Sequence, residues 1–597
     1  MAISNLPDVI AGATKEMGQW RRFLPILDWA RAYQRDDLVG DLMAGLIVAI
    51  MLVPQSMAYA LLAGLPPQVG LYASILPLIL YGLFGTSRTL AVGPVAIVSL
   101  LVASGLAPLA GGDVALYVRL ALTLALLAGI VQALLGLLRL GFIVNFMSHP
   151  VLSGFTSAAA LVIGFSQLGH LLGISMPRSE FVELVPYAVA HLGETNLVTA
   201  ALGVGSIGLL VVFKQWLGPW LQRRGVAERL ALPLTKSAPF VVVLLTTLLV
   251  WALRLQETAG VRIVGEVPAG LPPLTVPVFE SGTWQALLPT ALAISFVGYM
   301  ESIAVAKSLA SKRRQKIDAN QELLALGIAN AGAAFTGGYP VTGGFSRSVV
   351  NYEAGARSGL ASIVTAALIA VTVLLLTPLF YYLPQAALAA IVVVAVAGLV
   401  DLGAFRRVWH YNKGDAASLA VTFVAVLGWG VEVGILTGVV AAMLLYIWRT
   451  SRPHVAIVGR LGESETYRNV LRHEVQCWPN VVAVRIDESL YFANTKFLED
   501  TVLSIAAERA EVAHFVLICT AVNFVDASAL ETLESLQHEL AEADVTLHLA
   551  AVKGPVLDRL ARTGFLERVG DANIHETTHE AMQAIGVVAC NAGVSEK

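Results

Sequence analysis

A few polar side chains stand inside long apolar stretches of this sequence, where such groups are costly unless they have a task. Arg347 follows Ser346 in the first turn of a predicted membrane helix. An arginine there needs a partner or a watery cavity, and its guanidinium would attract an anion and partly neutralise it. The Ser346 hydroxyl could donate a hydrogen bond to the same anion. The alternatives are an ion pair between Arg347 and Glu301, and a Ser346 hydroxyl that bonds back into its own helix.

Three further residues are candidates for the same site. Glu301 is a carboxyl group near the middle of another apolar stretch, and such a group is a functional candidate by default. It could carry a proton or act as a fixed counter-ion, and a neighbouring Arg347 leaves its protonation open. Gln55 follows the helix-breaking Pro54, so its amide could donate to an anion, while Tyr59, one turn on, offers a pocket wall. Ordinary interhelical bonding and packing are the alternatives.

Two Gly/Pro-broken segments would position these side chains. The first is Ala91–Ala96, and the second, Gly337–Arg347, follows about 250 residues later, as in an inverted repeat. A half-helix that starts inside the membrane leaves its first N–H groups unpaired, and its peptide dipoles add partial positive charge. Two such ends that face each other would form a cradle for a small anion. Kinks that serve only packing are the alternative.

The composition indicates a membrane-embedded body. Of the 597 residues, 56% are apolar and only 14% are charged, against about 25% charged residues in an ordinary soluble protein. This excludes a disordered chain, a disulfide scaffold and a purely soluble enzyme. The net charge of −3 gives no basic footprint for nucleic acid. No signal peptide is visible, and no Walker A pattern argues for ATP-driven transport.

Charge-free stretches divide the first 450 residues into membrane spans. A bilayer core takes about 20 apolar residues per helix. On this basis we expect fourteen spans, which start near residues 40, 67, 90, 116, 151, 197, 237, 286, 321, 344, 360, 385, 415 and 433. Cations gather in the loops after even-numbered spans, which places these loops and both termini in the cytoplasm. The opposite loops hold few cations: Arg178, Arg254 and Arg262.

The last part of the chain has the composition of a small soluble domain. Strand-like and helix-like segments alternate there, which predicts an α/β fold. The predicted domains are a cytoplasmic segment at 1–38, a transmembrane domain at 39–450 and a cytoplasmic domain at 455–597. The cysteines, Cys477, Cys519 and Cys590, have no metal-ligand spacing. We expect structural thiols, no metal, no cofactor and no catalytic residue.

Several motifs resemble those of the sulfate permease (SulP) family, the bacterial and plant counterpart of the solute carrier 26 anion transporters. The motifs are Asp41–Leu46, Val53–Ala60, Gly64–Tyr72, Gly85–Arg88, Gly93-Pro94 and Gly344–Ser348. Leu490–Asn494 resembles a segment of the family's C-terminal STAS domain. One departure is Ala527, which follows Asp526 where phosphorylation-switched STAS proteins carry Ser or Thr. Ser528 lies one residue after that position. Because the phosphorylated side chain is missing from its usual position, we expect a dimerisation or regulatory module.

The resemblance implies an α-helical polytopic membrane protein with fourteen transmembrane helices in a seven-plus-seven inverted repeat. Spans 1–4 and 8–11 would form a core domain, and spans 5–7 and 12–14 a gate domain. The core would move against the gate as an elevator, in a homodimer held by membrane and STAS contacts. The anion site would lie between the starts of spans 3 and 10, with Glu301 close by, and would include Gln55, Tyr59, Val95, Ala96, Phe345, Ser346 and Arg347.

Together these features predict a secondary active transporter of a small inorganic oxyanion in a bacterial inner membrane. Sulfate with proton symport through Glu301 is the first hypothesis. Bicarbonate with sodium, or a dicarboxylate such as fumarate, is the alternative within the transporter class. An anion channel and a membrane-anchored signalling protein are the hypotheses from other classes.

Overall fold

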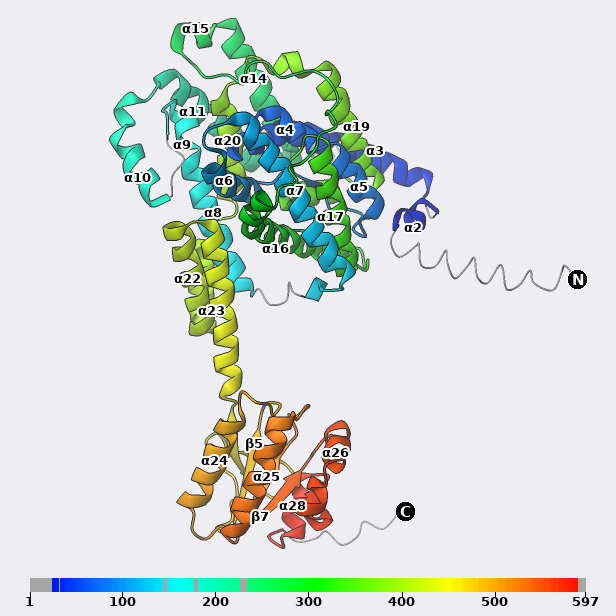
Figure 1. Cartoon of the computed structure of the whole chain (residues 1–597), viewed down its shortest axis with the longest axis vertical. Helices are drawn as coiled ribbons and strands as arrows, with labels where there is room; N and C mark the ends of the chain where they lie inside the picture. Colours follow the sequence, from blue (N-terminus) through cyan, green and yellow to red (C-terminus); the bar gives the residue numbers. More distant parts are fainter. Residues whose placement is uncertain (1–23, 32, 143–147, 177–180, 226–232, 589–597) are drawn as a thin grey trace, which may run out of the picture. The chain divides into compact units, whose positions relative to one another are not determined.

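The chain divides into two compact units, Met1–Ala442 and Met443–Lys597 (Figure 1). The computed structural model describes residues 24–31, 33–142, 148–176, 181–225 and 233–588. Most of the predicted N-terminal segment, together with Arg178 and Cys590, falls outside these ranges.

Apolar helices build the first unit. Their order is α2 (Ile26–Arg31), α3 (Arg35–Leu62), α4 (Pro67–Tyr72), α5 (Leu76–Phe84), α6 (Ala96–Ala110), α7 (Val114–Leu137), α8 (His149–Ser166), α9 (Leu168–Leu172), α10 (Phe181–Ala190), α11 (Leu197–Val212), α12 (Gly218–Arg223), α14 (Ala238–Ala252), α15 (Leu255–Ala259), α16 (Ser281–Lys312), α17 (Ala319–Phe335), α18 (Phe345–Glu353), α19 (Leu360–Leu375), α20 (Gln385–Ala397), α21 (Leu402–Tyr411), α22 (Lys413–Trp429) and α23 (Val431–Ser451).

Among the described residues, seven helical segments are long and apolar enough to cross a membrane, and five shorter apolar helices accompany them. Each of the fourteen predicted span starts lies close to the start of a helix. The number of crossings itself stays a prediction, because several of these helices are shorter than a bilayer core is thick.

The two halves of the first unit are interleaved. Helix α19 packs against α3, and α17 packs against both α5 and α7. At the two predicted breaks the chain is extended, and β1 (Val92–Gly93) pairs antiparallel with β2 (Thr342–Gly343). Helices α6 and α18 start just after these two strands, so the breaks lie side by side.

Buried carboxylates join loops of one half to helices of the other. Glu322 on α17 accepts hydrogen bonds from the backbone N–H of Thr86 (2.7 Å), from its hydroxyl (2.6 Å) and from the N–H of Ser87 (3.0 Å). Asp41 at the start of α3 accepts similar bonds from the segment 357–358. Each carboxylate is fully buried but well supplied with donors, so both have a structural role.

A mixed six-stranded sheet forms the second unit. Its strands are β3 (Val455–Arg460), β4 (Tyr467–Asn469), β5 (Val481–Ile486), β6 (His514–Ile518), β7 (Thr546–Ala550) and β8 (Ile574–His575), in the order β4-β3-β5-β6-β7-β8. Strands β5 to β8 are parallel, which confirms the predicted α/β fold. One apolar core includes α24 (Thr495–Glu508), α25 (Ala527–Glu542), α26 (Gly554–Ala561) and α27 (Phe565–Val569), and a second includes α28 (Thr578–Ala584).

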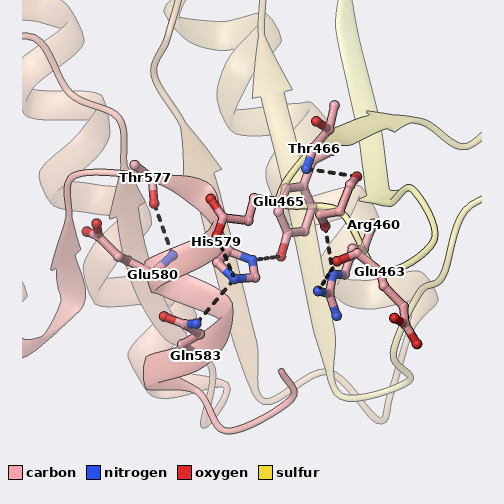
Figure 2. A network of polar contacts seen from close by, with 10 residues as sticks. Arg460, Glu463, Glu465, Thr466, Thr577, His579, Glu580 and Gln583 are labelled. Atoms are coloured by element: carbon pink, nitrogen blue, oxygen red, sulfur yellow. Dashed lines mark hydrogen bonds and ion pairs between the residues drawn. The ribbon is translucent and has the colours of Figure 1, made fainter. Parts of the chain in front are cut away.

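A polar network ties α28 to the β3–β4 hairpin (Figure 2). The ring of His579 lies between Tyr467, whose hydroxyl is 3.3 Å from Nδ1, and Gln583, whose Nε2 is 3.2 Å from Nε2. Arg460 closes the hairpin through the carbonyls of Glu463 and Ser464. The hairpin and α28 were not among the predicted elements.

A row of three histidines crosses the parallel strands on the face that α28 covers. His514 Nδ1 lies 3.1 Å from His548 Nε2, and His548 Nδ1 lies 3.2 Å from His575 Nε2. Burial is the main cause that lowers the pKa of His548 from 6.5 to about 4, and the two neighbouring imidazoles lower it further. Burial also lowers the pKa of His575. The folded domain therefore favours the neutral forms of His548 and His575.

Acid should destabilise the second unit through His548. Its pKa is lower in the folded state than in the unfolded chain, so stability is complete above pH 6.5 and falls as the pH drops towards 4. With allowance for partial solvation we expect a loss of about 1 kcal/mol at pH 5, or about 2–4 °C in Tm for a unit of this size. Thermal unfolding of the unit should show this loss, and His548→Asn should reduce it. The exposed His473→Asn is the control, and an equal loss in all three proteins would contradict the assignment.

Candidate functional site

The pairing of β1 with β2 brings the starts of α6 and α18 together. Besides the strand pairing, Gly344 donates its N–H to the carbonyl of Ala91 (3.1 Å), and Ala91 donates its own to the hydroxyl of Ser348 (2.9 Å). The residues that precede the two helices, Val95 and Gly344, provide no side-chain cap. The first N–H groups of both helices thus add positive potential at one place.

Arg347 lies behind these helix starts with most of its guanidinium unpaired. The side chain is only 2% exposed. Its Nη1 donates to the carbonyl of Pro94 (2.6 Å), whereas Nε and Nη2 are buried and have no hydrogen-bond partner in the described structure. The bond to Pro94 fixes the group from α18 against the break that precedes α6. Arg347 and Glu301 attract each other electrostatically but form no ion pair in the described structure.

Glycines give the guanidinium its place. A Cβ atom on Gly344 would lie 2.9 Å from Arg347 Nη2, and one on Gly93 would lie 3.3 Å from the same atom. Gly93 also has φ of +150°, which side chains rarely tolerate. Close approach of backbone and guanidinium therefore requires glycine at both positions.

Glu301 on α16 reaches the start of α18. Its carboxylate lies near the backbone N–H of Phe345, and Oε2 is buried without a partner among the described residues. Tyr59 and Arg347 lie within electrostatic reach of this carboxylate. The predicted neighbours therefore do lie together, with one negative and one positive group beside the helix starts.

The remaining predicted residues lie on α3 and at the start of α6. Gln55 and Tyr59 follow Pro54 on α3 and are each 6% exposed, and the side-chain oxygen of Gln55 has no partner among the described residues. Val95 and Ala96 are buried at the start of α6.

The first turn of α18 opens to a free surface. Phe345 is 56% exposed, and Ser346 is exposed beside it, whereas Arg347 is buried behind them.

Sequence reasoning missed the residues that hold β2 in place. Asn330 on α17 accepts from the N–H of Val341 (2.7 Å) and donates to its carbonyl (3.0 Å), as a neighbouring strand would. Its amide also donates to Gln132 on α7 (2.9 Å). The hydroxyl of Ser302 lies 2.7 Å from that of Thr342 and accepts from a backbone N–H of β2. The available signal was the presence of amide side chains in the middle of apolar helices.

Comparison with known proteins assigns the chain. The family model described as "Sulfate permease family" matches residues 38–422. The chain belongs to the sulfate permease family. A STAS domain model matches residues 472–581, which confirms the expected C-terminal domain. The family consists of multi-pass membrane transporters, and this agrees with the apolar helices of the first unit.

Similar family members come from plants and bacteria. Sulfate transporter 4.1, chloroplastic, of Arabidopsis thaliana is 38% identical over 596 residues, which cover 96% of this chain and 85% of the relative. A probable sulfate transporter of Mycobacterium tuberculosis (strain CDC 1551 / Oshkosh) is 34% identical, with coverage of 93% and 96%.

Solved structures share the fold. A structure of SLC26A9 superposes with a TM-score of 0.89 at 24% identity, over 96% of this chain and 94% of that one. The murine Slc26a9 anion transporter in the inward-facing state gives a TM-score of 0.87 at 25% identity, over 94% of each chain. These matches confirm a helical membrane protein that carries a STAS domain.

Gly344→Ala should displace the guanidinium and weaken transport. The new Cβ would lie too close to Arg347 Nη2, and the flexible side chain would move away. We expect the KM for the transported anion to rise about tenfold, which corresponds to about 1.4 kcal/mol. Uptake assays on purified, reconstituted protein would measure it. Gly205→Ala is the matched control because a Cβ there meets open space, and equal kinetics in both variants would contradict the prediction.

Proposed function

We propose that the chain is a secondary active transporter of a small inorganic oxyanion, with sulfate as the preferred substrate. The observation that carries the proposal is the meeting of two helix starts beside a buried guanidinium with two unpaired nitrogens. Unpaired donors of this kind are costly unless an anion accepts from them. The names of the relatives at 34–38% identity favour sulfate as that anion.

The substrate would bind between the tips of α6 and α18. The N–H groups at Ala96 and Ser346 and the free edge of Arg347 would donate to the oxyanion, as charge-assisted hydrogen bonds. Gln55 would donate its amide from α3, and the Tyr59 ring would form a wall. Both breaks are needed for this arrangement, because each contributes one helix start.

Glu301 would couple transport to protons. Its carboxylate lies near the Phe345 N–H, but Oε2 is buried without a partner among the described residues, and an unpaired charge there is unfavourable. A proton on that oxygen would remove the negative charge next to the incoming anion. The anion and the proton would then enter together and leave together, which is symport.

An elevator movement would carry the site across the membrane. The proposed core and gate helices are held by a few polar contacts, such as Thr290 to Glu432 (2.8 Å) and Lys236 to Glu353 (3.6 Å). These contacts between side chains can break and reform when one body slides. We propose a homodimer with both termini in the cytoplasm of a bacterial cell and the STAS domain as a regulatory or dimerisation module.

Other substrates and classes remain distinct alternatives. Bicarbonate with sodium is one, and the transmembrane domain of a cyanobacterium bicarbonate transporter superposes on 69% of this chain with a TM-score of 0.57 at 26% identity. A dicarboxylate is another. A channel would conduct without a coupling gradient, and a signalling protein would keep its function in Arg347→Ala.

Arg347→Ala should sharply weaken anion uptake. Loss of charge-assisted hydrogen bonds of about 1.5–3 kcal/mol corresponds to roughly a 10–100-fold loss in kcat/KM. Uptake of labelled sulfate, bicarbonate and fumarate into proteoliposomes would measure this loss and identify the substrate. Arg406→Ala, an exposed position on α21, is the control. Normal uptake by Arg347→Ala would rule out the proposed anion site.

Glu301→Gln should abolish accumulation driven by a proton gradient but spare anion exchange. The amide cannot release a proton, while the binding groups on α6 and α18 remain. Proteoliposomes with imposed proton or sodium gradients, and separately with unlabelled anion inside, would distinguish the two activities. Unchanged gradient-driven accumulation would remove the coupling role.

A further inference from the structure

A second polar pocket lies in the first unit, away from the helix breaks. It has a volume of about 380 Å³, and α2, the loop after α5 and the loop between α16 and α17 line it. Helix α2 packs against α5 here, as Figure 1 also shows. None of the residues of the proposed anion site contributes to this pocket.

Charges of both signs line the pocket without pairing. Arg88 and Lys316 supply two cations, and Asp28 and Asp318 supply two carboxylates. In the parts of the chain that the structure describes, none of these four forms an ion pair. Asp318 uses Oδ1 to cap α17 through the N–H groups of residues 320 and 321 (2.9 and 3.1 Å). A ligand that carries both a negative and a positive group would be electrostatically complementary to the charges that line this pocket.

A buried indole donor points to the negative group of that ligand. Nε1 of Trp29 is buried and has no hydrogen-bond partner in the described structure, and Trp29 lines the pocket together with Arg88. An indole N–H can only donate, so an acceptor such as a phosphate oxygen would satisfy it. The loop that carries Arg88 is held in place, because Thr86 and Ser87 donate hydrogen bonds to the carboxylate of Glu322.

The position of the pocket identifies the source of the ligand. It lies where α5 and α16 end and α17 begins, so it stands at the level of the lipid head groups when these helices cross the bilayer. Tryptophan with arginine or lysine is a usual combination at that level. A phosphate and an ammonium joined in one small head group are the chemistry of phosphatidylethanolamine.

We propose that this pocket binds the head group of a zwitterionic phospholipid that carries a primary ammonium. Arg88, Lys316 and the Trp29 N–H hold the phosphate, while Asp28 and the free oxygen of Asp318 hold the ammonium. The bound lipid joins α2 to the loops of both halves of the membrane unit.

Native mass spectrometry of the full-length protein in detergent tests this proposal. The probes are phosphatidylethanolamine, phosphatidylglycerol and phosphatidylcholine with the same acyl chains. We expect phosphatidylethanolamine to be retained preferentially, because phosphatidylglycerol lacks the cation and phosphatidylcholine has a methylated one. Equal retention of the three lipids would overturn the proposal.

Variants assign the binding to the pocket. The double variant Arg88→Gln with Lys316→Gln, and separately Trp29→Phe, should lower retention of phosphatidylethanolamine about fivefold or more. Asp28→Asn should lower its retention without changing that of phosphatidylglycerol. Arg314→Gln is the control, two residues from Lys316 and outside the pocket. Retention that none of the pocket variants changes, in proteins with unaltered gel-filtration profiles, would overturn the proposal.

A competition experiment excludes a dissolved ligand. Inorganic phosphate at millimolar concentration should leave the bound lipid in place, because it offers no ammonium and no acyl chain. Displacement of the lipid by phosphate would instead define a site for a free oxyanion and overturn the lipid assignment.

Discussion

Two short paired strands in the interior of the membrane unit fix the positions of the starts of α6 and α18. Broken helices leave backbone N–H and C=O groups exposed to apolar surroundings, which is unfavourable unless other groups bond to them. The breaks before α6 and α18 satisfy each other through the β1–β2 pairing and through bonds such as that from Gly344 to Ala91. Each break therefore supplies hydrogen-bond partners for the backbone of the other. The same pairing also holds the two helix starts side by side.

A second layer of polar side chains keeps this pairing in register. Asn330 bonds to both backbone groups of Val341, and Ser302 bonds to β2 from α16. Arg347 then crosses from α18 to the carbonyl of Pro94. Helices from both halves thus hold the helix starts, the guanidinium and the Glu301 carboxylate. The electrostatic potential at this point therefore depends on contacts from both halves of the unit.

The sequence predicted the features that depend on local chemistry. Glycine and proline mark both breaks, and the alternation of strands and helices after residue 455 gave β5, α24, β6 and α25 nearly in place. Residues from separate segments were harder to predict. The partners of Asn330 and the hairpin β3–β4 follow from contacts that no short-range pattern encodes. Glu301 and Arg347 could be named individually, and the family resemblance assigned them to one site, but only the fold shows that Arg347 bonds to Pro94.

The contact between Glu301 and the Phe345 N–H has one more consequence. The carboxylate brings a negative charge to the start of α18, where the proposed oxyanion would also bring one. In the proposed mechanism this side chain would repel other anions from the same place when it is ionised. Binding of an anion would then replace this carboxylate as the negative group beside α18, and it would also supply an acceptor for Arg347 Nε and Nη2, which have no partner in the described structure.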